Sequence, residues 1–392
     1  MQVKKRFSGM NRMEFLKAGL VGTASALIGG NAFAGVLQYA ASSEPFTVPA
    51  PVYRTLGRTG LKVTVVSFGA MLVPEPELLR IAFDQGVNYV DTARKYMDGK
   101  NEEIVGKAIK GRRDKVYVAT KTLPASKSKQ DIIGDVETSL KALGTDYVDV
   151  IQLHNLTDRE RIFIPETREA LTRLREQGKV RFFGVTTHKN QPEVLNALVD
   201  DKDRFFDTAL VAYNFESSPE IGDTIARLAK AGIGVIAMKT QAGGYKPEHL
   251  EALSPHQAAL KWVLQNPEIT MAIPGMKNLS HLKENMAVMG MPLSRADVNI
   301  LLRYHAAVQP YYCDFCGTCE STCPKGIDIS TINRSLMYAE GYRNHDLALS
   351  TYRELPQRAS AAACKDCPVC VASCVRGLNI AARMERARNV LA

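Results

Sequence analysis

Eight short apolar runs, each followed by an amphipathic segment, set the strongest limit on the fold of this chain. The runs are rich in Val, Ile, Tyr and Phe and mostly unbroken, as strands are when both faces of a sheet are covered. They are Val63–Ala70, Asn88–Ala93, Lys115–Thr122, Val148–Asn155, Val180–His188, Asp207–Asn214, Gly234–Thr240 and Ile269–Gly275. Eight strand–helix units over residues 52–310 predict an α/β fold, a closed (β/α)8 TIM barrel.

The segments around these runs agree with a barrel. Asp131–Leu143 and Pro165–Gln177 have helical patterns, the second with proline at the first helical position. A doubly wound sheet is disfavoured because no run is followed by a G-x-G-x-x-G turn. Val52–Val63, with Gly57 and Gly60, predicts a hairpin that closes the floor of the barrel.

Residues able to move or polarise a proton lie at or just after the ends of three successive runs. Asp91 lies near the end of the second run, Lys121 of the third and His154 of the fourth, and Tyr96 comes five residues after Asp91. Taken singly, such residues more commonly cap helices, face solvent or satisfy a backbone group. Because active sites of barrels form where the carboxyl ends of the strands meet, their coincidence predicts an active site there.

All eight cysteines lie in two copies of one spacing, C-x2-C-x2-C-x3-C, near the C-terminus. The first copy is Cys313, Cys316, Cys319 and Cys323, and the second is Cys364, Cys367, Cys370 and Cys374. In two-cluster ferredoxins three thiolates of such a run bind one cube, and the fourth reaches the other. The pattern predicts two [4Fe–4S] clusters, which could transfer electrons or serve only as a structural support.

Disulfides and zinc are the weaker alternatives for these cysteines. Disulfide frameworks are typical of small secreted chains, and structural zinc favours C-x2-C pairs separated by a longer loop.

Forty residues separate the two cysteine motifs, more than a compact ferredoxin needs. The helical patterns Ile329–Tyr342, His345–Glu354 and Ala381–Val390 predict a small, mainly helical ferredoxin-like domain over residues 311–392.

Residues 1–34 resemble an export signal, and residues 35–51 a linker. A basic start precedes the uncharged stretch Ala18–Gly30 and the small-x-small site Ala32–Ala34. Asn11–Lys17 resembles the twin-arginine motif, which suits folded, cluster-loaded cargo, although Met13 replaces the second arginine. The stretch is short and glycine-rich for a spanning helix. We therefore expect a removed signal, no stable transmembrane span and a periplasmic protein, with a cytoplasmic location as the alternative.

The net charge of +9 does not indicate nucleic-acid binding. Five basic residues and Glu14 place +4 of it in the first 17 residues and leave +5. Two cubes with four thiolates each would add roughly −2 apiece. The remaining chain is then nearly neutral and carries no motif that reads bases.

Residues 52–290 resemble the aldo-keto reductase family in several separate motifs. The matching segments are Asp91–Tyr96 (D-T-A-x-x-Y), Ala119–Lys121 (A-T-K), Asp149–His154 (the strand of the family's histidine), Gly184–Thr187 (G-V-S/T), and Ile273–Gly275 with Glu284 and Asn285 (I-P-G and E-N). The C-terminal region resembles the variant of this family that carries a ferredoxin-like domain.

The resemblance implies hydride transfer between a nicotinamide and an aldehyde, ketone or alcohol. Tyr96 would donate the proton, because the ammonium of Lys121 lowers the pKa of its phenol and Asp91 holds that lysine. His154 would donate to the carbonyl oxygen and orient the substrate.

The resemblance also implies a coenzyme site, with NADP slightly favoured over NAD. Thr186 and Thr187 would contact the nicotinamide carboxamide, and Glu284 and Asn285 the adenine. The remaining coenzyme positions are Met238, which replaces a stacking tyrosine, with Lys239, Gly275 and Lys277. Lys277 could hold the 2′-phosphate of NADP. Leu210 stands where many members have the glutamine that contacts the carboxamide.

Three functions fit these patterns. The first is an NAD(P)H-dependent carbonyl reductase acting on a small molecule, with structural or redox-sensing clusters. The second is an exported electron-transfer oxidoreductase that serves an outside redox protein, which would need a flavin or similar group to split hydride into single electrons. The third is a non-catalytic barrel that binds a partner and carries structural clusters.

Overall fold

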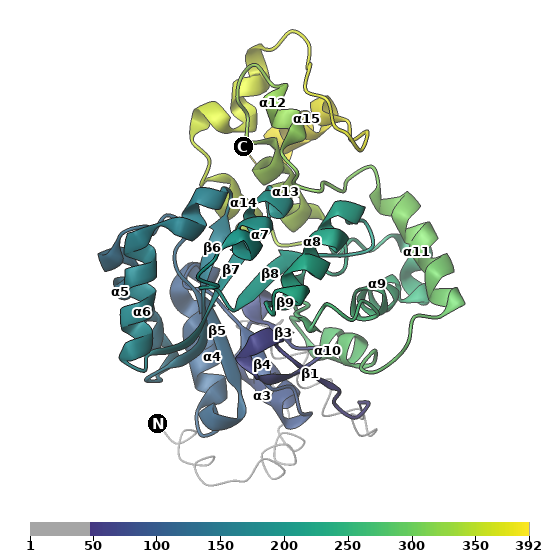
Figure 1. The fold of residues 1–392 in the computed structure, drawn as a ribbon. Coiled ribbons are helices and arrows are strands. Elements are labelled where there is room, and N and C mark those ends of the chain that lie inside the picture. The colour runs from purple at the N-terminus through teal and green to yellow at the C-terminus, as the bar shows by residue number, and fades with distance from the viewer. Residues whose placement is uncertain (1–47, 392) are drawn as a thin grey trace, which may run out of the picture.

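The computed structural model describes residues 48–391, and eight parallel strands form its centre (Figure 1). In sheet order they are β3 (Phe68–Gly69), β4 (Tyr89–Asp91), β5 (Tyr117–Lys121), β6 (Val148–Leu156), β7 (Val180–Thr187), β8 (Thr208–Ala212), β9 (Gly234–Met238) and β10 (Met271–Ala272). Parallel bridges from Val66 to Ala272 and from Gly69 to Gly275 join the first strand region to the last. The predicted (β/α)8 barrel is confirmed. Each strand lies inside its expected run except β6, which ends one residue beyond it.

A hairpin fills one end of the barrel. Strands β1 (Tyr53–Thr55) and β2 (Lys62–Thr64) pair antiparallel, as expected from the sequence. Leu56, at the turn, is fully buried in the interior cluster formed by side chains of the strands. Gly57 is required here, since its φ is +48° and a Cβ atom would lie 2.3 Å from the backbone nitrogen of Gly234. The hairpin therefore closes the floor of the barrel by packing, and the opposite end remains available to a ligand.

Helices cover the outside of the barrel, and their apolar faces form the main core against the strands. They are α3 (Pro76–Asp84), α4 (Lys100–Ile109), α5 (Lys129–Leu143), α6 (Pro165–Glu176), α7 (Gln191–Asp200), α8 (Pro219–Lys230), α9 (Pro255–Leu264), α10 (Leu279–Met286) and α11 (Arg295–Val308). Two of these helices have a serine as N-cap, Ser128 at α5 and Ser294 at α11. Each serine side chain accepts a hydrogen bond from a backbone N–H of the first turn.

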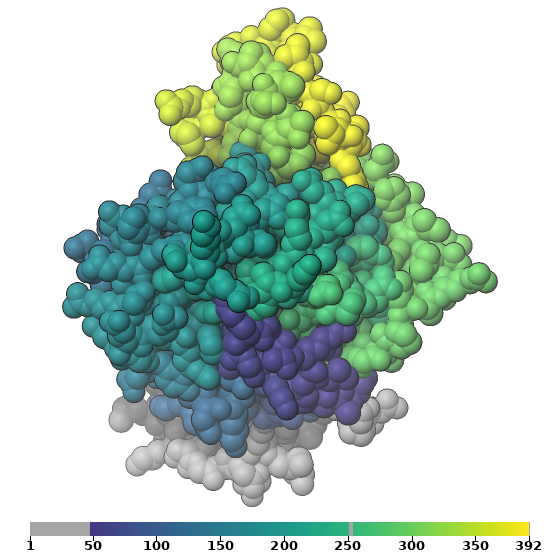
Figure 2. Space-filling view, in the orientation of Figure 1, coloured from purple at the N-terminus to yellow at the C-terminus, as the bar shows by residue number. Residues whose placement is uncertain are grey.

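The C-terminal region is a small helical module with its own buried cluster. Its helices are α12 (Thr318–Ser321), α13 (Ile329–Glu340), α14 (His345–Tyr352) and α15 (Ile380–Leu391). All three helices expected here from the sequence are present, with ends shifted by one or two residues. The module lies on the end of the barrel opposite the hairpin, with α13 and α14 against the barrel (Figures 1 and 2).

The expected export signal, residues 1–34, lies outside the described residues. None of the helices in residues 48–391 combines the length and apolar character that a membrane crossing requires.

Candidate active site

A buried ion pair lies at the end of the barrel that faces the module. Lys121, at the end of β5, is 1% exposed and donates from Nζ to Oδ1 of Asp91, at the end of β4. Its ammonium also donates to the carbonyl oxygen of Thr92 at 2.7 Å, and Gln152 Nε2 donates to the other Asp91 oxygen at 2.7 Å. Every carboxylate oxygen thus has a donor, as a buried charge pair requires.

Tyr96 and His154 lie above this pair. The Lys121 ammonium is 4.9 Å from the centre of the Tyr96 ring, and the Tyr96 and His154 rings meet edge to face at 6.0 Å. Tyr96 begins a short 3-10 turn, Tyr96–Gly99, after β4, whereas His154 is carried by β6. The structure therefore brings together all four residues that the sequence predicted as catalytic.

The pKa of Tyr96 differs in direction from the sequence-based expectation. Burial raises it well above the ordinary value, and the Asp91 charge adds to this effect, while Arg334 opposes it. Burial also lowers the pKa of Lys121, against the opposing charge of Asp91. The Lys121 charge is compensated by its partner and does not overcome the desolvation of the phenol. Tyr96 consequently stays protonated near neutral pH.

Two histidines at this end of the barrel, His154 and His188, are held neutral by burial. Burial lowers the pKa of His154 well below its ordinary value, and Lys121 and other cations lower it further. His188 has its pKa lowered in the same way, first by burial and then by Arg334. The His154 Nδ1 atom has no hydrogen-bond partner among the described residues. A neutral imidazole can still donate one N–H to a ligand.

A cavity of about 660 Å³ opens over these residues. Asp91, Tyr96 and His154 line its inner end. Its walls also include six of the predicted coenzyme positions, which are Met238, Lys239, Gly275, Lys277, Glu284 and Asn285. The cavity thus runs from the candidate catalytic residues toward α10.

The other predicted coenzyme residues are placed differently. Thr186 and Thr187 are fully buried and lie outside the cavity lining. The Thr186 hydroxyl accepts from the backbone N–H of Asn155 at 2.7 Å, and Thr187 donates to the carbonyl of Lys189 at 2.9 Å. Leu210 lies in the lining, and so do Asn155 and His188.

The module also contributes to this cavity, which was not predicted from the sequence. Arg334, Tyr338 and Tyr342, on and just after α13, line it opposite the barrel residues. Lys239 donates from Nζ to the phenolic oxygens of Tyr338 and Tyr342, at 3.0 and 3.3 Å. No sequence signal showed this, because the contacts join positions about a hundred residues apart.

The eight cysteines are all unpaired thiols in the module. Burial raises the pKa of Cys313, and the charges of Cys319 and Cys316 add to it. Burial raises the pKa of Cys319 to about 11, with contributions from Glu320 and Cys374, and burial raises that of Cys364, with a contribution from Cys323. The two motifs meet where the backbone N–H of Ser373 donates to the hydroxyl of Thr322 at 3.2 Å, one residue before the fourth cysteine of each motif. Among the described residues, no group of three or more His, Cys, Asp or Glu side chains is positioned to hold a metal ion.

Comparison with known proteins identifies the barrel. The model of the Aldo/keto reductase family matches residues 75–249 and 247–304, more than half of the chain, and ends before the first cysteine. The chain therefore belongs to the aldo/keto reductase family. Several of its relatives are named as reductases or oxidoreductases, and this protein is an oxidoreductase of that type.

Individual relatives and solved structures agree with this family assignment. The chain is 29% identical to the methylglyoxal reductase YeaE of Escherichia coli over 246 residues, covering 59% of this chain and 85% of the relative. It is 37% identical to the aldo-keto reductase YhdN of Bacillus subtilis over 155 residues, covering 34% and 46%. The aldo-keto reductase of Klebsiella pneumoniae in complex with NADPH superimposes with a TM-score of 0.55 at 28% identity, covering 64% of this chain and 95% of that one.

Proposed function

We propose that the barrel reduces an aldehyde or ketone, or oxidises the corresponding alcohol, with Tyr96 as the proton donor. One arrangement carries this proposal: a protonated, buried phenol over the Lys121–Asp91 pair, with the neutral His154 beside it at the end of a cavity. Tyr96 would protonate the carbonyl oxygen, and the Lys121 ammonium would stabilise the phenolate that forms. His154 would hold the same oxygen by donating its N–H.

NADP(H) is the coenzyme that we propose for this site. It would supply the hydride when bound. The cavity has suitable walls for a dinucleotide, because it extends from Tyr96 past Met238 to Lys277, Glu284 and Asn285. The buried hydroxyl of Thr240, also in the lining, has no partner among the described residues and is available to a ligand. The NADPH complex of the Klebsiella pneumoniae relative supports NADP over NAD.

Substitution of the proton donor tests this function. Tyr96→Phe should lower kcat for reduction of methylglyoxal by about 10²- to 10⁴-fold, the usual contribution of a general acid, because the ring stays and the proton is lost. The measurement is NADPH consumption by the full chain, with NADPH affinity followed by fluorescence. Tyr53→Phe, at an exposed position of the hairpin at the other end of the barrel, is the matched control. Undiminished turnover in Tyr96→Phe would refute the assignment of Tyr96.

We also propose that the module holds two [4Fe–4S] clusters. Eight thiols with no disulfide are chemically suited to iron–sulfur ligation. The hydrogen bond between Ser373 and Thr322, each of which directly precedes the fourth cysteine of its motif, supports a crossed set of ligands. One cluster would use Cys313, Cys316, Cys319 and Cys374, and the other Cys364, Cys367, Cys370 and Cys323.

Electron transfer to an outside redox protein is the second candidate function. The position of the module favours it, since α13 lines the same cavity as Tyr96. The full chain, purified anaerobically with its clusters, would be mixed with NADPH and followed by electron paramagnetic resonance. A reduced-cluster signal would support electron sharing between barrel and module. Its absence, with NADPH bound, would leave the carbonyl reductase, and absence of turnover as well would favour the non-catalytic barrel.

The proposed location is the periplasm, after removal of residues 1–34. N-terminal sequencing of the protein recovered from cell fractions tests this. A mature chain beginning at Gly35 in the periplasmic fraction is the expected result, and an intact Met1 in the cytoplasmic fraction would contradict it.

A further inference from the structure

Arg334 is a buried cation that has no carboxylate partner within residues 48–391. The residue is 9% exposed, and its Nη1 donates to Oδ1 of Asn155 at 3.3 Å. Its Nε atom is buried without a hydrogen-bond partner, and Nη2 donates to no described residue. By contrast, Lys121 and Lys95 near the same cavity are paired with Asp91 and Glu354. The ammonium of Lys239 has no carboxylate partner among the described residues either, but it donates to the phenols of Tyr338 and Tyr342. A buried charge without a partner is costly, so the free Nε–Nη2 edge calls for an anion from outside the chain.

This guanidinium faces the reacting end of the cavity. Arg334 lines the cavity together with Tyr96 and His154, and its charge is close enough to lower the pKa of both. The two histidines there are neutral, and Asp91 is committed to Lys121 and Gln152. An anionic group bound beside Tyr96 would therefore find Arg334 as its partner.

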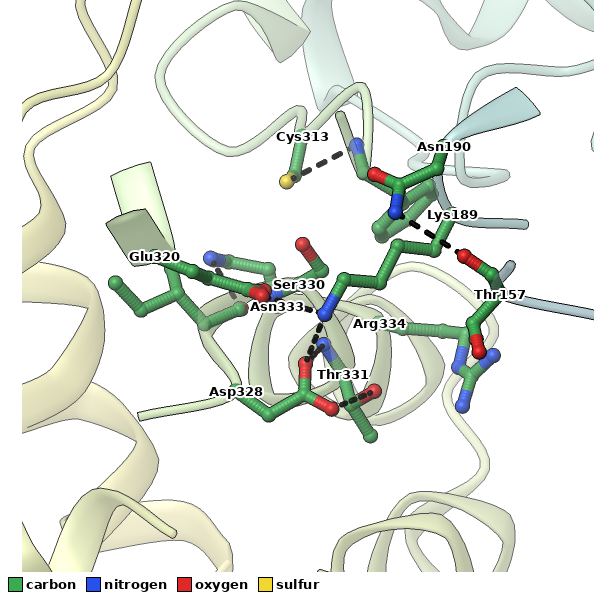
Figure 3. Close-up of polar contacts among 12 residues, drawn as sticks. Thr157, Lys189, Asn190, Cys313, Glu320, Asp328, Ser330, Thr331, Asn333 and Arg334 are labelled. Atoms are coloured by element: carbon green, nitrogen blue, oxygen red, sulfur yellow. Dashed lines mark hydrogen bonds and ion pairs between the residues drawn. The ribbon is translucent and has the colours of Figure 1, made fainter. Parts of the chain in front are cut away.

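Ion pairs fix the helix that carries Arg334. Lys189, just after β7 of the barrel, reaches between Glu320 and Asp328 of the module (Figure 3). Asp328 caps α13 by accepting from the backbone N–H of Thr331 at 3.0 Å. One turn after Arg334, Tyr338 accepts from Lys239 of the barrel. The helix is held at both sides of Arg334, so the free edge has a fixed position, as preorganised binding requires.

We propose that Arg334 binds a carboxylate of the substrate, and that the barrel acts on carbonyl compounds bearing such a group, that is, oxo acids. The inference rests on the proposed carbonyl reduction and names its substrate class. A guanidinium edge with two free N–H groups matches a carboxylate in a bidentate pair. The recognition element belongs to the module, so the module would select the substrate of the barrel.

A matched pair of aldehydes tests this specificity in the full chain. With saturating NADPH, wild type should reduce 4-carboxybenzaldehyde with a higher kcat/KM than its uncharged analogue 4-formylbenzamide. Arg334→Met should lower kcat/KM for the acid by about 10- to 150-fold, the usual range for a lost charged hydrogen bond, and change the amide little. Arg334→Lys should retain part of the preference. Equal losses for both aldehydes, or no preference in wild type, would overturn the proposal.

A second variant leaves Arg334 in place. Asn155→Asp puts a carboxylate beside the guanidinium, and Asp tolerates the left-handed backbone at this position, where φ is +55°. The ion pair between this new carboxylate and Arg334 should remove the preference for 4-carboxybenzaldehyde over 4-formylbenzamide. An unchanged melting temperature is the control for folding. A preference that survives in Asn155→Asp and Arg334→Met would refute the role of Arg334.

Binding measurements separate this proposal from the proposed reaction. Calorimetric titration of benzoate, with benzamide as control, into the protein with NADP should show benzoate binding that Arg334→Met abolishes. If neither aldehyde is reduced but benzoate binding depends on Arg334, the proposed reaction fails and the anion site stands. If both aldehydes are reduced but benzoate binding does not depend on Arg334, the anion site is refuted and the proposed reaction stands. An Arg334→Met protein that loses NADPH affinity instead would assign the anion to the coenzyme phosphates and overturn the proposal.

Discussion

At the scale of single residues, burial decides the protonation states of the site. Sequence reasoning expected Lys121 to lower the pKa of Tyr96, but the ammonium is balanced by Asp91 and the phenol lies in a desolvated position. Full burial can shift a pKa by roughly 3–5 units, more than a charge that already has a partner. The result is a phenol that keeps its proton until a ligand oxygen accepts it.

The neutral histidines predict a loss of stability in acid. The folded protein resists protonation of His154 and His188, whereas the unfolded chain binds these protons below about pH 6.5. Because the unfolded state then holds more protons, the free energy of unfolding should fall as the pH decreases, by up to about 1.4 kcal/mol per unit for each histidine. Urea unfolding at pH 7.5, 6.5 and 5.5 measures this.

Substitutions test whether His154 and His188 cause this loss of stability in acid. His154→Gln should weaken the pH dependence, while His345→Gln, at an exposed position in the module, should leave it unchanged. Stability that is constant or increases on acidification would contradict the buried, neutral state of the histidines.

At the scale of elements, a close backbone contact seats α13 on the barrel. A Cβ atom on Gly341, at the end of α13, would lie 2.0 Å from the carbonyl oxygen of Gly243, in the loop after β9. That loop also carries Gly244, whose added Cβ would meet the Tyr342 ring at 3.3 Å. Glycine is needed here because two backbones meet, and only the absence of a side chain permits their approach.

Gly341→Ala should therefore push α13 away from the barrel. We expect a loss of about 1–3 kcal/mol in the free energy of unfolding, as in other overpacked sites, and weaker ligand binding in the cavity. Gly134→Ala in α5, where an added Cβ meets nothing within 4 Å, is the control and should be neutral or slightly stabilising. Thermal unfolding of both variants gives the comparison, and equal stabilities would refute the contact.

At the scale of the whole molecule, the barrel and the module join next to the cysteines. Glu320, which follows Cys319, pairs with Lys189 of the barrel. On the other side Arg376, two residues after Cys374, donates to the buried carboxylate of Glu216 at 2.6 Å. Both junctions thus lie beside Cys319 and Cys374, which we propose as ligands of one cluster, so this cluster would order the module over the cavity.

Loss of one ligand should affect the module and spare the barrel. Cys319→Ser should reduce bound iron from about eight to about four atoms per chain, the content of one cube. The barrel should stay folded because its core consists of its own strands and helices. Iron analysis and limited proteolysis measure the two effects, with the exposed Ser321→Ala as control. Unfolding of the whole chain would show instead that the clusters hold the barrel together.

The barrel, its floor and the four candidate catalytic residues could all be predicted from the sequence alone. These follow from local patterns, since a run buried on both faces is apolar throughout and parallel strands of a closed barrel present their ends on one side. The spacing of the cysteines is equally local. Only the tertiary structure decided which residues face the catalytic ones from the module, namely Arg334, Tyr338 and Tyr342. The pattern of α13 is that of any amphipathic helix, and Tyr342 comes just after it. The surface that such a helix covers depends on long-range packing, which sequence spacing does not encode.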